Sequence, residues 1–528
     1  MNRVTFGARD LDVANVTANG WTAWVEDQLR PPAGDDPDLD RYLKSFTVHI
    51  QYDSFDDNLT NYHWKGVNED RPLSYLTASL EKIWKTTRQI PWTVSFEEAG
   101  RMEMEFISSV YIRNAHSRYQ LREFMTDFWS NHFNVGRAKS YLVGNPLIIY
   151  DRDVIRPNVF GNFRQMLEAV AMSNSMLFYL DNAASTATIP NENYARELME
   201  LHTMGRGAYF GKNPGDGDVS DRGFTDEDIV QASRALSGWT VRFGQNGAME
   251  GSPPDQQVNY PDDGQFIYNS SAHNTKAGRC LGFDLSTIRE NTRAQGQKVL
   301  DLVAFHPATG PFICGKLCRR IFGDNPPSSV MARAIEAWTN YKYHPNQIAI
   351  VLRAILLGGA EVGTGPCTKV RRPYERFIGM VRTTDTLLSP TPYWRIYLQD
   401  VNDSPFTWPT PDGRPDSNQF WLSTYAMVTA WDQLKAFSDT TSIKKSLVAQ
   451  TPVETFNSPA AMVEYWVGRM IGYTLSDEAM KALTALATNA GTIPQEAATN
   501  PGVAANWEIN FARDVIATIA AAPEFVLR

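Results

Sequence analysis

Apolar residues recur at intervals of three and four along most of the chain, the spacing that places them on one face of an α-helix. Alternation of apolar and polar residues, which marks a half-buried strand, is scarce. The helical pattern covers residues 72–88, 96–113, 115–131, 161–180, 191–204, 225–238, 292–306, 311–322, 328–341, 345–357, 371–388, 420–436, 458–472, 476–489 and 505–521. The sequence therefore predicts an all-α or α-dominated protein, a large multi-helix globular fold with long irregular loop insertions.

Two predicted connections, 206–224 and 240–291, are longer than ordinary loops, and such loops tend to be functional or disordered. A third irregular segment, 389–419, combines prolines with aromatic residues, which predicts an ordered and packed loop. These features suggest three regions: an N-terminal helical region (1–114), a central helical core carrying the two long loops (115–388), and the aromatic, proline-rich loop with a C-terminal helical region (389–528).

Composition narrows the classes of partner. The 528 residues include 59 acidic and 50 basic ones, a formal net charge of −9, so the positive field that neutralises phosphates is missing and nucleic acid is not an expected partner. The chain has no uninterrupted apolar run of about 18 residues, so we expect no transmembrane segment. The polar first residues show no signal peptide, so export would require a signal removed before this numbering begins.

The first candidate for chemistry is His132, which ends a predicted helix between two asparagines and close to three aromatic residues. One interpretation is a structural histidine bonded to the backbone at a helix terminus. The other is a metal ligand or a proton-transfer group. The sequence leaves both open.

The densest polar cluster is the segment 190–205. On a helix, Asn193, Arg196, Glu197 and Glu200 fall at three-four spacing on one face. If that face is exposed, it is a routine ladder of arginine–glutamate pairs. If it is buried, the two carboxylates can hold a metal or act as general acid and base. The Glu-x-x-His spacing of di-iron bundles is absent, which disfavours the metal interpretation.

A calcium loop is a further hypothesis. Asp216, Asp218 and Ser220 supply oxygen atoms at positions one, three and five of an EF-hand-like loop, and Glu227 stands at position twelve. Against calcium, position six lacks the glycine that the sharp turn needs, and Thr225 with Asp228 forms a capping box that explains the acidic residues without a metal. A solvated acidic loop is the alternative.

Several blocks resemble a known family. They are FWSNHFNV, PNENYARELMELHTMG, FTDEDIVQASRALSGWTV, AFHPATGPFICGKLCRRI and the closing APEFVLR, together with the opening NRVTFGARDLDVANV. Their order over nearly the whole chain resembles the bacterial family catalogued only as domain of unknown function 1800. The resemblance marks His132, Asn193, Arg196, Glu197, Glu200 and His273 as positions that the family usually keeps. It brings no established activity.

The resemblance also implies a setting. Members are commonly exported and are often encoded beside a sulfatase-like family of unknown function 1501, which makes such a protein a possible partner. His273, in a long loop with Lys276 and Gly278, is a candidate to reach over a site or to bind a metal. Export and an even number of cysteines together predict two disulfides, each joining Cys280 or Cys367 to Cys314 or Cys318.

Two function hypotheses follow. The first is an exported hydrolase-like enzyme in which Glu197, Glu200 and His132, assisted by Asn193 and Arg196, act on an acidic or carbohydrate-like substrate, with or without a divalent metal or calcium. The second is a non-catalytic structural or interaction protein in a cell-surface or extracellular assembly, with the polar helix face tied up in internal ion pairs.

Overall fold

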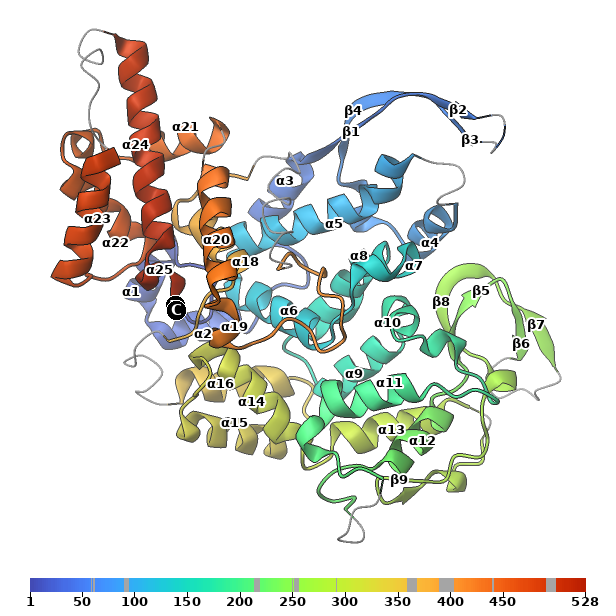
Figure 1. Ribbon diagram of the computed structural model, residues 1–528. Helices are drawn as coiled ribbons and strands as arrows, with labels where there is room; N and C mark the ends of the chain where they lie inside the picture. Colours follow the sequence, from blue (N-terminus) through green and yellow to red (C-terminus); the bar gives the residue numbers. More distant parts are fainter. Residues whose placement is uncertain are drawn as a thin grey trace.

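The α-dominated fold is confirmed by the computed structural model of the chain (Figure 1). It describes residues 1–57, 59, 62–89, 95–212, 219–248, 250, 256–290, 292–358, 368–388, 403–438, 441–490 and 500–528. One continuous cluster of buried apolar side chains runs from Val4 to Phe525 and crosses all three regions suggested by the sequence. The division into three regions stays a prediction.

The N-terminal part contains short helices and a long β-hairpin arm. The helices are α1 (Asp10–Asn19), α2 (Trp21–Gln28), α3 (Pro37–Ser45) and α4 (Leu80–Gln89). The arm, which the sequence pattern did not predict, pairs β1 (Thr47–Tyr52) with β4 (Val67–Pro72) and, toward its tip, β2 (Phe55–Asp57) with β3 (Tyr62–Trp64), all antiparallel. Figure 1 shows the arm projecting from the helical body.

The central helices include α5 and α6, both of which are buried along most of their length. In chain order they are α5 (Phe96–His116), α6 (Gln120–His132), α7 (Tyr141–Gly144), α8 (Leu147–Ile149), α9 (Phe163–Ala171), α10 (Asn174–Tyr179), α11 (Glu192–Glu197), α12 (Asp226–Ala235) and α13 (Ala294–Ala304). Two π-helical turns, η3 (Tyr150–Ile155) and η6 (Leu198–Thr203), interrupt this set. The predicted capping box of Thr225 and Asp228 is confirmed at the start of α12.

The segment 240–291, predicted to be an irregular loop, instead contains antiparallel strand pairs. They are β5 (Trp239–Phe243) with β8 (Asp262–Tyr268), β6 (Asn246–Ala248) with β7 (Gln257–Asn259), and β9 (Arg279–Cys280) with β10 (Phe283–Asp284). The prediction failed because these strands are short and their many polar residues hide the two-residue period. The 206–224 loop is held by a parallel bridge between Tyr209 and Phe224, and its residues 213–218 lie outside the described part.

The remaining helices form two groups, one below the central core and one at its side (Figure 1). They are α14 (Thr309–Phe322), α15 (Ser328–Asn340), α16 (Gln347–Leu357), α18 (Pro373–Thr383), α19 (Asn418–Trp421), α20 (Thr424–Ser438), α21 (Thr441–Gln450), α22 (Pro459–Met470), α23 (Asp477–Ala490), α24 (Pro501–Ala521) and α25 (Pro523–Val526). The two ends of the chain meet, because Arg528 donates from Nη1 to the carbonyl of Arg3 at 2.8 Å.

The cysteines do not pair as predicted. Cys280, Cys314 and Cys318 are buried free thiols, and burial raises the pKa of each. The predicted bridge from Cys280 to α14 is therefore absent, and Cys367 lies outside the described residues. Small apolar-like thiols pack well in a helical core without forming bridges.

Candidate functional site

The polar segment 190–205 changes its helical geometry partway. α11 is capped by Asn191, whose Oδ1 accepts a hydrogen bond from the Tyr194 backbone N–H at 2.9 Å. The π-helical turn η6 follows directly, and the Thr203 hydroxyl donates to the Leu198 carbonyl at 2.7 Å. Such turns concentrate at functional sites because they alter the direction of side chains within a helix.

Gly205 terminates this turn against α14. Its φ is +86°, and a Cβ at this position would lie 2.5 Å from the Phe312 ring. Both the backbone conformation and the close contact therefore require glycine. This contact holds the end of η6 next to the helix that carries Lys316.

The predicted polar face is only partly buried. Asn193 is exposed, as the first of the two alternatives requires. Arg196 is half-buried and donates from Nη1 to Glu200 Oε1 at 3.3 Å. Glu200 also meets Arg206, with 3.4 Å between Oε2 and Nε. Two guanidinium groups therefore pair with Glu200.

Glu197 has a different environment. Its Oε2 is buried and has no hydrogen-bond partner within the described part of the chain. Burial raises the pKa of Glu197 above its ordinary value, Glu200 and Asp412 raise it further by repulsion, and the opposing effects of Arg206 and Arg196 do not compensate. Glu197 is therefore a more basic carboxylate than an exposed glutamate.

His132 is buried at the end of α6 and has a polar partner at each ring nitrogen. Nε2 lies 3.0 Å from the His202 carbonyl, which can only accept, so Nε2 carries the proton. Nδ1 lies 2.9 Å from Lys316 Nζ and accepts its proton in a hydrogen bond. Burial, and then the charges of Lys316 and His202, lower the pKa of His132 well below its ordinary value. The imidazole is therefore neutral and orients the Lys316 ammonium.

Lys316 lies on α14, and its side chain is partly exposed. Burial lowers its pKa to about 8, with Arg319 adding to the shift and with Asp416 and Asp412 opposing it. Desolvated lysines serve as proton donors or nucleophiles because their pKa approaches neutrality. Neighbouring His202 stays neutral, since burial and Lys316 lower its pKa to about 3.

Asp412 connects the two halves of the site. It interacts electrostatically with Glu197 on α11 and with Lys316 on α14. These two residues are 119 positions apart in the sequence numbering, and Asp412 comes from a third segment. Asp412 is therefore within electrostatic range of both a basic carboxylate and an acidic ammonium.

The loop that carries Asp412 is tightly attached to the end of α6. Asn131 donates from Nδ2 to the Arg414 carbonyl at 3.1 Å and accepts at Oδ1 from the Arg414 N–H at 2.8 Å. Asn134 donates to the carbonyls of Trp408 and Thr410 at 3.0 and 2.8 Å. The prediction of a packed loop is thus confirmed for residues 403–419, whereas 389–402 lie outside the described part.

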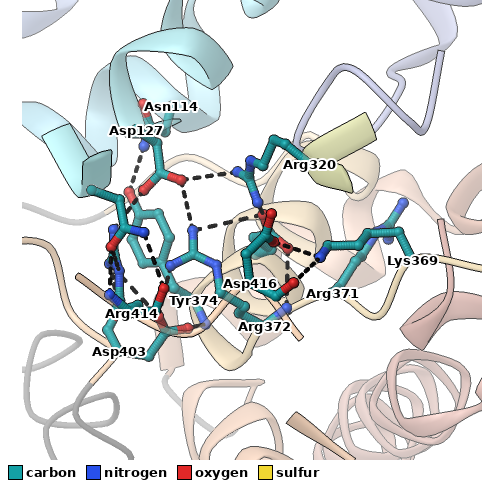
Figure 2. A network of polar contacts seen from close by, with 12 residues as sticks. Asn114, Asp127, Arg320, Lys369, Arg371, Arg372, Tyr374, Asp403, Arg414 and Asp416 are labelled. Carbon is teal, nitrogen blue, oxygen red and sulfur yellow. Dashed lines mark hydrogen bonds and ion pairs between the residues drawn. The ribbon is translucent and has the colours of Figure 1, made fainter. Parts of the chain in front are cut away.

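A buried network of ion pairs also holds this loop in place (Figure 2). Asp127 accepts from Arg320, Arg372 and Arg414 at 2.9, 2.6 and 3.0 Å. Asp403 accepts from Arg372 Nη1 at 2.9 Å. Although burial raises the pKa of Asp127, the three arginines lower it below its ordinary value. The ion pair between Asp127 and Arg414 thus connects the loop to α6.

The calcium hypothesis gains no support from the described residues. Asp216 and Asp218 lie outside them. Ser220 uses its carbonyl to accept from His306 Nε2 at 3.0 Å, and Glu227 accepts from Gln231 within α12. Among the described residues no three His, Cys, Asp or Glu side chains form a group that could hold a metal ion. The predicted divalent metal therefore has no ligand set in this part of the chain.

His273 is buried in the fold and does not reach over the site. Its Nδ1 lies 3.1 Å from the Ser237 carbonyl and its Nε2 lies 3.1 Å from Gln295 Oε1. With both nitrogens engaged by protein groups, neither is directed toward a ligand. Through these contacts, His273 holds the 270–285 segment against α12 and α13.

The sequence analysis missed Lys316 and Asp412. Lys316 is the only lysine in the apolar block AFHPATGPFICGKLCRRI, and a lysine within an apolar helix face was an available signal. Asp412 lies in a proline-rich turn with no helical or strand period. Its role depends on a tertiary contact, so no local pattern could reveal it.

The chain matches the model of a family described as protein of unknown function (DUF1800) over residues 1–527. No curated protein and no solved structure matches it. No helix among the described residues has the length and apolar character needed to cross a membrane. The matched residues cover nearly the full length, in agreement with the resemblance of the separate blocks. The chain belongs to the DUF1800 family.

Proposed function

We propose that the protein is a hydrolase that works by acid–base catalysis, with Glu197 as the general base and Lys316 as the general acid. The observation that carries this proposal is that both groups interact with Asp412 while their pKa values are displaced toward neutrality from opposite sides. A general base is most effective when its pKa is raised and a general acid when its pKa is lowered, provided that both keep the required protonation state.

The proton transfers follow from these assignments. Glu197 takes a proton from water, whose oxygen bonds to the electrophilic centre of the substrate. Lys316 gives its proton to the leaving atom as the scissile bond breaks. His132 acts on Lys316 as a positioning residue, because its neutral Nδ1 accepts from the ammonium. Proton exchange with solvent then restores both groups.

The remaining predicted residues have supporting parts. Arg196 and Arg206 both pair with Glu200, and Glu200 raises the proton affinity of Glu197. Arg206 is largely exposed beside Glu200, which favours an acidic or carbohydrate-like substrate. Asn193 has no part in this scheme. Export and association with a DUF1501 protein remain proposals that rest on the family resemblance.

The test is hydrolysis of a panel of chromogenic esters, phosphate esters, sulfate esters and glycosides, followed by a pH profile. We expect a bell-shaped kcat/KM whose acidic limb follows protonation of Glu197 and whose alkaline limb follows loss of the Lys316 proton near pH 8. Lys316→Met should lower kcat by about 10²–10⁴-fold and remove the alkaline limb. Asn193→Ala, at an exposed position of α11, the helix that carries Glu197, is the control and should leave the profile unchanged.

The non-catalytic alternative makes the opposite prediction. If the polar groups serve only as ion pairs, no substrate is turned over, and replacing Glu197 lowers stability as it does for a buried salt bridge. Activity that persists unchanged in both Glu197→Gln and Lys316→Met would also contradict the assigned roles.

A further inference from the structure

A cavity of about 300 Å³ lies at the other end of α6, away from Lys316 and Glu197. Its wall is formed by the loop after α2, by α5 and α6, and by the turn that follows η3. Five of its lining residues are arginines and one is an acid: Arg30, Arg113, Arg122, Arg152, Arg156 and Asp35. A wall with this composition is unusual, because arginine is rarely buried without a partner, and Arg122 and Arg156 are both largely buried.

Two of these arginines retain an unused donor. Arg122 is buried and donates from Nε to Glu123 at 3.1 Å and from Nη1 to the Gly34 carbonyl at 2.8 Å, while its buried Nη2 makes no hydrogen bond in the described part of the chain. Arg156 donates from Nε to Asp151 at 2.6 Å and from Nη1 to Glu123 at 2.7 Å. Its Nη2 is likewise buried without a hydrogen-bond partner there.

The acids that balance this charge are mostly placed behind the wall. Glu123 and Asp151 hold the inner edges of the two guanidiniums and do not line the cavity. The exception is Asp35, which Arg113 binds with both Nε and Nη2 and which lies 3.6 Å from Arg122 Nη2, beyond hydrogen-bond distance. Burial alone would raise the pKa of Asp35, but Arg113, Arg156 and Arg122 lower it below its ordinary value. The wall therefore favours negative charge.

We infer that this cavity binds the oxyanionic group of a small ligand through the guanidinium groups of its wall, Arg122 and Arg156 foremost. Guanidinium groups match the geometry of phosphate, sulfate and carboxylate oxygens, and a pre-organised pair loses little freedom on binding. The volume exceeds that of an inorganic anion, which leaves room for a small organic group attached to it. This inference is independent of the proposed hydrolase activity.

Gly34 offers a variant that blocks the cavity without breaking an ion pair. It lines the wall, and a Cβ at this position would meet no atom within 4 Å. Gly34→Leu therefore fills space at the wall while leaving all five arginines in place. Gly100→Leu is the matched control, because its Cβ also meets nothing and it lies 13 positions before Arg113 on α5, about 20 Å along the helix.

The experiment is isothermal titration calorimetry of the full chain with inorganic phosphate, sulfate and acetate at constant ionic strength, using chloride as the reference. We expect saturable binding of one anion per chain, weakened by about tenfold or more in Gly34→Leu and unchanged in Gly100→Leu. Tighter binding of phosphate or sulfate than of acetate identifies a tetrahedral oxyanion, and the reverse identifies a carboxylate. Absence of saturable binding by all three anions, or equal binding by Gly34→Leu and the parent protein, would overturn the inference.

Discussion

The buried network around Asp127 and the candidate site around Asp412 involve one loop and the same kinds of residue. The pKa of Asp127 in the first is nevertheless lowered, whereas the pKa of Glu197 in the second is raised. Asp127 faces three guanidiniums, and its pKa falls below the ordinary value. Glu197 faces two other carboxylates, and its pKa rises. Burial lowers the pKa of Lys316 on α14 to about 8.

Burial alone therefore does not distinguish a structural charged group from a reactive one. What matters is whether the neighbours carry the opposite charge and complete the hydrogen bonds. In the network, three guanidiniums pair with Asp127 and lower its pKa. The candidate site leaves Glu197 Oε2 without a hydrogen bond within the described residues, and the pKa of Glu197 is raised.

The largest effect is expected from Asp127→Asn. The amide removes the charge that Arg320, Arg372 and Arg414 share, so three buried cations lose their common partner. We expect a loss of about 3–5 kcal/mol in the free energy of unfolding, measured by urea denaturation. Asp301→Asn is the control, because Asp301 pairs with Arg164 but is 44% exposed, and it should cost less than about 1 kcal/mol. Equal costs would contradict a special role for the network.

The second effect concerns the pH dependence of stability through Lys316. Its folded pKa is about 8, below the ordinary value of 10.5, so the unfolded chain binds more protons between these two pH values. The parent protein should therefore gain stability as pH rises from about 8 to 10.5, by up to about 3 kcal/mol. Lys316→Met should lack this gain in urea unfolding measured across the range. Parallel curves for parent and variant would contradict the lowered pKa.

The smallest effect is expected from Glu197→Gln. A raised folded pKa means that the ionised carboxylate is destabilising at neutral pH, and that this penalty vanishes as pH falls below the unfolded value of about 4.3. The variant should therefore match the parent at low pH and equal or exceed it by up to about 1 kcal/mol at pH 7. Urea midpoints at both pH values test this. A loss of several kcal/mol at pH 7 would place Glu197 in a structural ion pair like Asp127.

Helices with a regular apolar face could be predicted closely. The patterns at 96–113 and 328–341 correspond to α5 and α15, which end within three residues of the predicted bounds. The pattern at 161–180 covers two helices instead, because Ser173 caps α10 by accepting from the Met176 N–H at 3.3 Å. Apolar spacing continues across such a break, so periodicity alone cannot place it.

The candidate site could be predicted only in part. His132, Glu197 and Glu200 were recognised as polar residues on predicted helices, and they lie within or beside the site. Of the predicted polar face, Asn193 is exposed to solvent, and η6 replaces the regular α-helical period after Glu197. Lys316 and Asp412 acquire their roles from contacts between segments far apart in the chain.

The sequence by itself determined which segments become helices, where α12 is capped, and that charged residues concentrate between 190 and 205. These properties depend on neighbours within a few residues, so local spacing is sufficient to specify them. Contacts between distant segments lower the pKa of Asp127, raise that of Glu197, and bring Arg122 and Arg156 to the wall of one cavity. Proton affinity and binding depend on the charges and donors that surround a group in space, and folding brings those neighbours from distant parts of the chain.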